Sequence, residues 1–327
     1  MHDTFLIYPS YFPPKKGKMH KKFLPFIFLI ACLLYSACKN SEIKSNYPEV
    51  LRFGVSTLEE DPEQARYRMK GMKAYLEKEL GIEVEIHEVS GYATIIEALK
   101  SKKLDICSLG SFSYILAAQS ANVEAISCRG TLNGRPEPYH GVLITSPSSG
   151  LKSIDDVKKN ASGLTLAFGD PASTSGHLIP RAYLETIGLT NNKFKQTFFT
   201  NSHSTTFFTV RSGKTDIGCV SESTINKLIK EGRVKRNEFV VLWKSDPIIN
   251  SAIGIRKDLD IGFKLEVQKA LADFRFKDPA NWKKYGVLIA KQTILPYDSL
   301  CLINAHDSMF NELRQLSGRY NLLRQKR

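Results

Sequence analysis

One pattern recurs along the chain from Leu51 onward and restricts the folds open to it. A short apolar run rich in β-branched residues is followed by a few small polar residues and then by a segment with helical spacing. The pattern occurs in residues 51–81, 84–103, 104–121, 164–188, 194–214 and 215–232. Strands that alternate with helices pack as layers, so the sequence predicts an α/β protein.

Two stretches, residues 128–153 and 239–260, interrupt this alternation. Each joins strand-like residues to Gly, Pro and Ser, as crossings of the chain between domains do. We therefore expect two α/β lobes, one built from residues 48–141 and 241–327 and the other from residues 142–240. A double crossover of this kind forms a hinge with a cleft between the lobes.

The first 38 residues have a different composition. A basic segment, KMHKK, precedes the apolar run of residues 23–37. This run is shorter than a typical transmembrane helix. The ending LYSAC resembles a bacterial lipobox, in which Cys38 is lipidated, although Tyr35 replaces the usual aliphatic residue. A plain secretory signal with an incidental cysteine is the alternative.

Residues 1–18 fit neither a signal peptide nor a domain, and Met19 is a more natural initiator than Met1. Residues 39–47 have the composition of a flexible tether. We therefore expect an exported protein that a lipid anchors to a membrane, on the periplasmic or outer side.

The basic surplus does not indicate a nucleic-acid partner. The chain has 46 Lys and Arg and 33 Asp and Glu; residues 1–38 contain five and one of these, which leaves 41 and 32 and a net charge of about +9. The basic residues are scattered and are not interleaved with aromatic residues, as binding of single-stranded nucleic acid requires. The sequence predicts a solvated basic surface.

The remaining cysteines have no metal-site spacing. They are Cys107, Cys128, Cys219 and Cys301, with no CxxC or Cys-His pattern. Two of them lie in apolar, strand-like runs, which favours buried free thiols, whereas export also permits a disulfide. We expect neither a metal nor a cofactor.

Residues 169–185, GDPASTSGHLIPRAYLE, place three hydroxyl residues directly before a predicted helix. The N-terminus of a helix carries unpaired N–H groups and a partial positive charge, so it can hold an anion. Ser173, Thr174 and Ser175 add O–H donors, and Gly176 allows close approach. A tetrahedral oxyanion such as phosphate or phosphonate fits this density of donors; ordinary N-capping, which needs one hydroxyl, is the alternative.

Two further turns carry candidate donors. His203 lies in NSHSTTFFTV, where it can donate to an anion or cap the helix. Tyr92 opens a helix in SGYATIIEAL, and its phenol can donate or simply pack.

The segment GDPASTSGHLIP resembles the D-P-x-S-T-S-G-x-L-x-P signature of solute-binding proteins that serve phosphonate, phosphite and phosphate ABC transporters. The similarity extends over residues 50–320 and includes GYATIIEAL, LDICSLGSFSYILA, YHGVLIT and SHSTTFFTVRSGKTDIG.

The resemblance implies a type II periplasmic binding fold with the ligand between the lobes, an ABC permease in the membrane as partner, and a monomer. It assigns the oxyanion to Tyr92, Ser173, Thr174, Ser175 and His203.

In relatives that bind aminoalkyl phosphonates, carboxylates receive the ammonium group of the ligand. One of these aligns with Glu222, which also suits the N-terminus of a helix as an ordinary acid. The second carboxylate falls near Ser251, and a tyrosine before the family glycine, Gly110, is Leu109 here. These two departures predict that an ammonium-bearing ligand is disfavoured. They also place Leu109, Gly110 and Ser251 in the expected cleft lining.

Two other functions suit the same fold. An enzyme would need a nucleophile with a base beside it, and convergent donors around an anion explain the same residues without leaving hydroxyls unused. A lipid-anchored sensor would pass its closed state to a receptor in place of a permease. The sequence favours a binding protein without catalysis.

We predict that Cys38 carries lipid, because the apolar run ends at Ala37 and a tether follows. Expression in a lipidating bacterium and mass measurement of the mature N-terminus should show diacylglyceryl-modified Cys38. An unmodified N-terminus at Lys39 or later would contradict the anchor.

Overall fold

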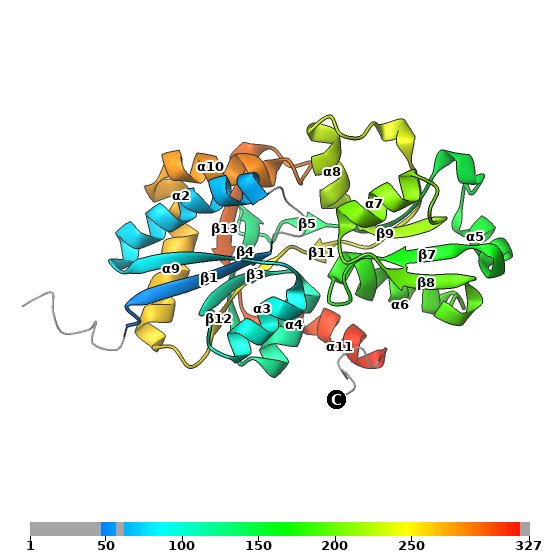
Figure 1. The fold of residues 1–327 in the computed structure, drawn as a ribbon. Coiled ribbons are helices and arrows are strands. Elements are labelled where there is room, and N and C mark those ends of the chain that lie inside the picture. Colours follow the sequence, from blue (N-terminus) through cyan, green and yellow to red (C-terminus); the bar gives the residue numbers. More distant parts are fainter. Residues whose placement is uncertain (1–46, 57–61, 321–327) are drawn as a thin grey trace, which may run out of the picture. The chain divides into compact units, whose positions relative to one another are not determined.

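The computed structural model describes residues 47–56 and 62–320 (Figure 1). The predicted signal peptide, Cys38 and all of the tether except its last residue lie outside the described residues. That residue, Tyr47, packs its ring 5.1 Å from the ring of Phe263 and donates a hydrogen bond to Glu266. No helix within the described ranges is long and apolar enough to cross a membrane.

The first sheet has six strands in the order β13-β4-β12-β3-β1-β2. β1 pairs in parallel with β2 and β3, and β12 joins β3 to β4 in antiparallel fashion. The strands are β1 Val50–Ser56, β2 Glu83–Val89, β3 Ile106–Leu109, β4 Val123–Thr131, β12 Ala252–Arg256 and β13 Leu300–Asn304. Its helices are α2 Pro62–Leu80, α3 Tyr92–Lys100, α4 Ser111–Ser120, α9 Ile261–Lys277, α10 Pro279–Ala290 and α11 Asn311–Arg319.

The second sheet has five strands in the order β10-β6-β9-β7-β8. They are β6 Gly141–Thr145, β7 Thr165–Phe168, β8 Gln196–Phe199, β9 Ile217–Ser221 and β10 Val240–Lys244. Its helices are α5 Ile154–Asn160, α6 Ile179–Thr186, α7 His203–Arg211 and α8 Glu222–Lys230. β10 pairs with β6, so this sheet extends beyond residue 240, where we expected the chain to cross over.

The chain passes between the two sheets through a short antiparallel ribbon. Its strands are β5 Pro138–Tyr139 and β11 Ile248–Ile249, which lie between the sheets in Figure 1. Both belong to stretches where the sequence breaks its alternation of strand and helix. The predicted α/β class is confirmed.

Helix α2 shows how the sequence specifies the first core. Ala65, Met69, Met72, Leu76 and Leu80 are buried and recur every three or four residues, which places them on one face of the helix. This face joins the buried cluster of β1 and α9. The four cysteines of the described chain, at positions 107, 128, 219 and 301, are buried and free.

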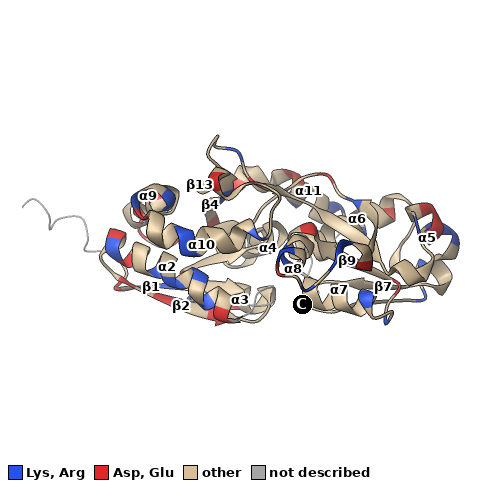
Figure 2. Ribbon diagram, turned by 90° about the horizontal axis from the view of Figure 1, so that it is seen from above, with Lys and Arg blue, Asp and Glu red and all other residues tan. Residues whose placement is uncertain are grey.

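Charged side chains are spread over the molecule. Figure 2 shows Lys and Arg on the helices of both sheets, with Asp and Glu interspersed among them.

An ion pair with a buried carboxylate connects β1 to the start of β3. Asp105, whose side chain is 1% exposed, accepts bonds from the backbone N of Arg52 at 3.0 Å and from its Nε at 2.8 Å and Nη2 at 3.0 Å. Arg256 of β12 lies 3.4 Å away from the same carboxylate. One side chain thus connects three neighbouring strands.

We predict that Asp105→Ala lowers the free energy of unfolding by about 3 to 5 kcal/mol, because Arg52 and Arg256 lose the buried acceptor that they share. Chemical denaturation should measure this loss. The control is Glu88→Ala, which removes an exposed pair with Arg66 and should cost less than about 1 kcal/mol. Equal effects of both variants would show that Asp105 has no special role.

Candidate ligand-binding site

A cavity of about 150 Å³ is lined by residues from both sheets. Its walls come mainly from the ends of strands and the starts of the helices that follow them, where backbone N–H groups remain unpaired. The lining includes all of the predicted binding and cleft residues except Glu222: Tyr92, Leu109, Gly110, Ser173, Thr174, Ser175, His203 and Ser251. The structure therefore gathers into one cavity residues that are far apart in the sequence.

The three hydroxyl residues lie where β7 leads into a π-helical turn, Thr174–Leu178. Ser173 caps this turn, since its Oγ accepts a hydrogen bond from Gly176 N at 3.0 Å. Thr174 Oγ1 accepts from Phe112 N, at the start of α4, at 2.8 Å. A hydroxyl that accepts a bond still has its own hydrogen to donate. Capping and anion binding are thus compatible here.

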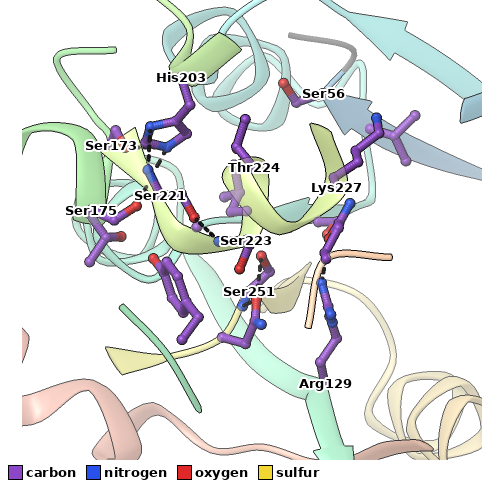
Figure 3. Close-up of a pocket in the computed structure, with 18 of the residues that line it drawn as sticks. Ser56, Arg129, Ser173, Ser175, His203, Ser221, Ser223, Thr224, Lys227 and Ser251 are labelled. Atoms are coloured by element: carbon purple, nitrogen blue, oxygen red, sulfur yellow. Dashed lines mark hydrogen bonds between the residues drawn. The ribbon is translucent and has the colours of Figure 1, made fainter. Parts of the chain in front are cut away.

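His203 begins α7, and its ring is buried between the turn and β9. Its Nδ1 accepts a hydrogen bond from Ser221 N at 3.1 Å in the tautomer that carries the proton of the neutral ring on Nε2. Nε2 lies 3.3 Å from Ser173 Oγ and 3.5 Å from Ser175 Oγ (Figure 3). Burial lowers the pKa of His203 to about 4, although the charge of Asp170 opposes this shift. The neutral imidazole therefore presents an N–H donor beside the serines.

Two glycines provide the space that this arrangement needs. A Cβ at Gly176 would lie 2.6 Å from Cε1 of His203, so only a hydrogen fits beneath the imidazole. A Cβ at Gly110 would lie 3.5 Å from Thr174 Oγ1 and 3.8 Å from the hydroxyl of Tyr92. The phenol of Tyr92 thus approaches the same point as Thr174.

Glu222 is not placed in the lining. It is the first residue of α8, and its carboxylate pairs with Lys244 of β10 at 2.8 Å. Thr224 and Lys227 of the same helix do line the cavity. Two residues correspond to about 200° around a helix, so Glu222 faces away when Thr224 faces inward.

The sequence analysis missed several lining residues, among them Arg68, Arg129, Tyr139, Lys227, Asn250 and Gln292. Tyr139 belongs to the ribbon strand β5; burial raises the pKa of its phenol, and hydrogen bonds with Ser175 and Thr174 oppose the shift. The only local signal was its position as the first residue of the segment YHGVLIT. Which face of a crossing segment borders a cleft depends on its pairing with a distant strand.

The arrangement suits recognition of an anion by neutral donors. Hydroxyls of the turn, the Nε2–H of His203 and a tyrosine hydroxyl converge on one end of the cavity. Within the part of the chain that the structure describes, no three His, Cys, Asp or Glu side chains gather as a metal site would need.

The family of periplasmic substrate-binding proteins of phosphonate ABC transporters matches residues 54–288. The chain belongs to this family. A relative in Escherichia coli K12, the phosphonates-binding periplasmic protein, is 31% identical over 185 residues, which are 56% of this chain and 54% of that protein. The match thus spans about half of that relative.

A second relative aligns with this chain over nearly its whole length. A probable ABC transporter phosphite binding protein, PhnD1 of Prochlorococcus marinus, is 23% identical and covers 91% of this chain and 98% of its own. The structure of PhnD1 in complex with methylphosphonate has a TM-score of 0.72 with this chain, at 21% identity and with 84% and 99% of the two chains covered.

A phosphonate-transporter binding protein from Pseudomonas aeruginosa has a TM-score of 0.71, at 23% identity and with 82% and 85% covered. The predicted type II periplasmic binding fold is confirmed.

We predict that a second buried histidine of this family member makes stability depend on pH. Burial lowers the pKa of His177 to about 4. The unfolded histidine, with a pKa of about 6.5, binds more protons between these values, so stability is lost as the pH falls from about 6.5 towards 4. Between pH 6.5 and 5, wild type should lose about 1 to 2 kcal/mol more unfolding free energy than His177→Asn.

The substitution His177→Asn keeps a donor for Pro171 O, which His177 Nδ1 contacts at 2.7 Å. Denaturation at each pH measures both proteins under the same conditions, so other titrating groups cancel. Parallel pH profiles would contradict the prediction.

Proposed function

We propose that this protein is the solute-binding component of an ABC transporter and holds phosphonate, phosphite or phosphate for import. The observation that carries the proposal is the convergence of the Ser173, Thr174 and Ser175 hydroxyls with His203 Nε2 at one end of a cavity lined from both sheets. Tyr92 adds a further donor. A phosphorus oxyanion that leaves water needs several such bonds to replace its hydration.

The lobes in this proposal are those expected from the sequence, residues 48–141 with 241–327 and residues 142–240, except that residues 241–244 go with the second lobe. The membership of the strands in two sheets supports the division, with β10 moving the second crossing to after Lys244. Closure of the lobes around the ligand would be recognised by permease subunits in the membrane. A lipid on Cys38 would keep the protein close to them, and a monomer suffices.

Catalysis is not part of the proposal. In a hydrolytic triad, a carboxylate orients the histidine through its second ring nitrogen. Here that nitrogen, Nδ1 of His203, accepts from the backbone N–H of Ser221, so it cannot donate to a carboxylate in this tautomer. This geometry supports binding and not proton transfer from a serine.

We predict that Thr174→Ala weakens binding of methylphosphonate by about ten- to a hundred-fold, since a charge-assisted hydrogen bond is worth about 1.5 to 3 kcal/mol. Thr174→Ser keeps the hydroxyl and should stay close to wild type. Calorimetry on purified protein measures the affinities, and denaturation measures separately the loss of the bond from Phe112 N.

His203→Ala should weaken binding in the same way, because it removes the Nε2–H donor. The proposed site would be wrong if both alanine variants bound methylphosphonate, phosphite and phosphate within twofold of wild type.

A further inference from the structure

The cavity has a second end with different chemistry. Figure 3 shows Ser173, Ser175 and His203 on one side of the pocket and Lys227 and Arg129 on the other. We call this second side the distal end and define it by Arg129, Lys227, Asn250 and Gln292, all of which line the cavity. Nothing in the proposed binding of a phosphorus group uses these four residues.

The side-chain amide of Asn250 has a hydrogen-bond donor that no protein group accepts. Its Oδ1 accepts from the backbone N of Ser251 at 2.8 Å, and a backbone N–H can only donate, so the other amide atom must be Nδ2. Asn250 is 5% exposed, and its buried Nδ2 has no hydrogen-bond partner. A buried donor without an acceptor is costly, so this amide indicates an acceptor supplied by a ligand.

Gln292 is oriented in a similar way. Its Oε1 accepts from Arg129 Nη1 at 2.6 Å, which leaves its NH₂ group as the part that can face a ligand. Arg129 itself forms an ion pair with Glu137, to which it donates from Nε at 2.7 Å and from Nη2 at 2.9 Å. The backbone N of Asn250 donates to Glu137 O at 3.2 Å, which connects these groups.

The lining contains basic side chains and no acidic ones. Among the described residues that line the cavity, Arg68, Arg129 and Lys227 are basic and none is Asp or Glu. Lys227 is 5% exposed and has an interaction within the protein, but an ammonium carries three N–H donors and can bond a ligand oxygen as well. An ammonium-bearing ligand would meet donors and like charges here.

The cavity also has room for more than one small oxyanion. Its volume is about 150 Å³, whereas a cavity of about 10 to 15 Å³, measured in the same way, holds one water. A phosphorus group at the serine end would therefore leave space towards the distal end.

We infer that the ligand is a phosphonate with a second anionic group, of the carboxylate type, which the distal end binds through Asn250, Gln292 and Lys227. This inference rests on the proposed function, which places the phosphorus group at the serine end. A carboxylate offers only acceptors, and these match an end of the cavity that offers donors. The substrate class is carboxyalkyl phosphonates, such as 3-phosphonopropionate.

Calorimetry on purified protein with three ligands of similar length tests the inference. We expect 3-phosphonopropionate to bind at least tenfold tighter than propylphosphonate, which lacks the charge, and than 2-aminoethylphosphonate, which reverses it. Methylphosphonate is the reference for the phosphorus group alone. Equal or weaker binding of 3-phosphonopropionate than of propylphosphonate overturns the inference and leaves the proposed function intact, whereas no binding of any phosphorus ligand overturns both.

Two variants locate the second group. Asn250→Asp and Lys227→Met should each reduce the preference for 3-phosphonopropionate over propylphosphonate at least fivefold. The matched controls are Asn237→Asp and Lys283→Met, which make the same changes at exposed positions and should keep the preference. An unchanged preference in both cavity variants overturns the assignment to the distal end, and far-UV circular dichroism verifies that each variant is folded.

Discussion

The hydrogen bond from Ser221 N to His203 Nδ1 determines much of what this cavity can do. It joins the end of β9 to the start of α7, and it is made in the tautomer that carries the ring proton on Nε2. Burial then keeps the ring neutral by lowering its pKa to about 4. The imidazole is consequently a donor towards Ser173 and Ser175 without being a fixed cation. The geometry of the strand ends and the chemistry of the cavity thus depend on the same contact.

Neutral donors suit a protein that must both bind and release an anion. A hydroxyl or an N–H pointed at an oxyanion contributes a charge-assisted bond, whereas a buried lysine at that point would need a partner whenever no anion is there. The turn at Ser173 and Thr174 meets this condition, because its hydroxyl oxygens already accept bonds from Gly176 N and Phe112 N. The oxygens are therefore held in place by backbone donors.

The sequence predicted those parts of the molecule that depend on local pattern. Alternating apolar runs and helical segments predicted β1, β2, β3, β7, β8 and β9 with the helices after them, and the hydroxyl turn marked one end of the cavity. Lobe boundaries, lipidation and the roles of individual site residues stay predictions.

What the sequence missed depends on distant pairing. Tyr139 and Asn250 lie in or beside the ribbon of β5 and β11, whose register is set between residues about 110 apart in the chain. The motif predicted that Glu222 lines the cavity, but α8 is oriented so that Thr224 and Lys227 line it instead. Local spacing does not reveal which side of a helix a second lobe will cover.

Gly176 has a consequence for how such a protein can diverge. Because only a hydrogen fits beneath the His203 ring, a side chain at position 176 would also require a substitution of His203. Asn250 and Lys227 are on separate elements, and single substitutions there change the chemistry of the wall without disturbing that ring. Descendants of this chain can therefore acquire new ligand preferences stepwise at one end of the cavity, while the other end is inherited almost unaltered.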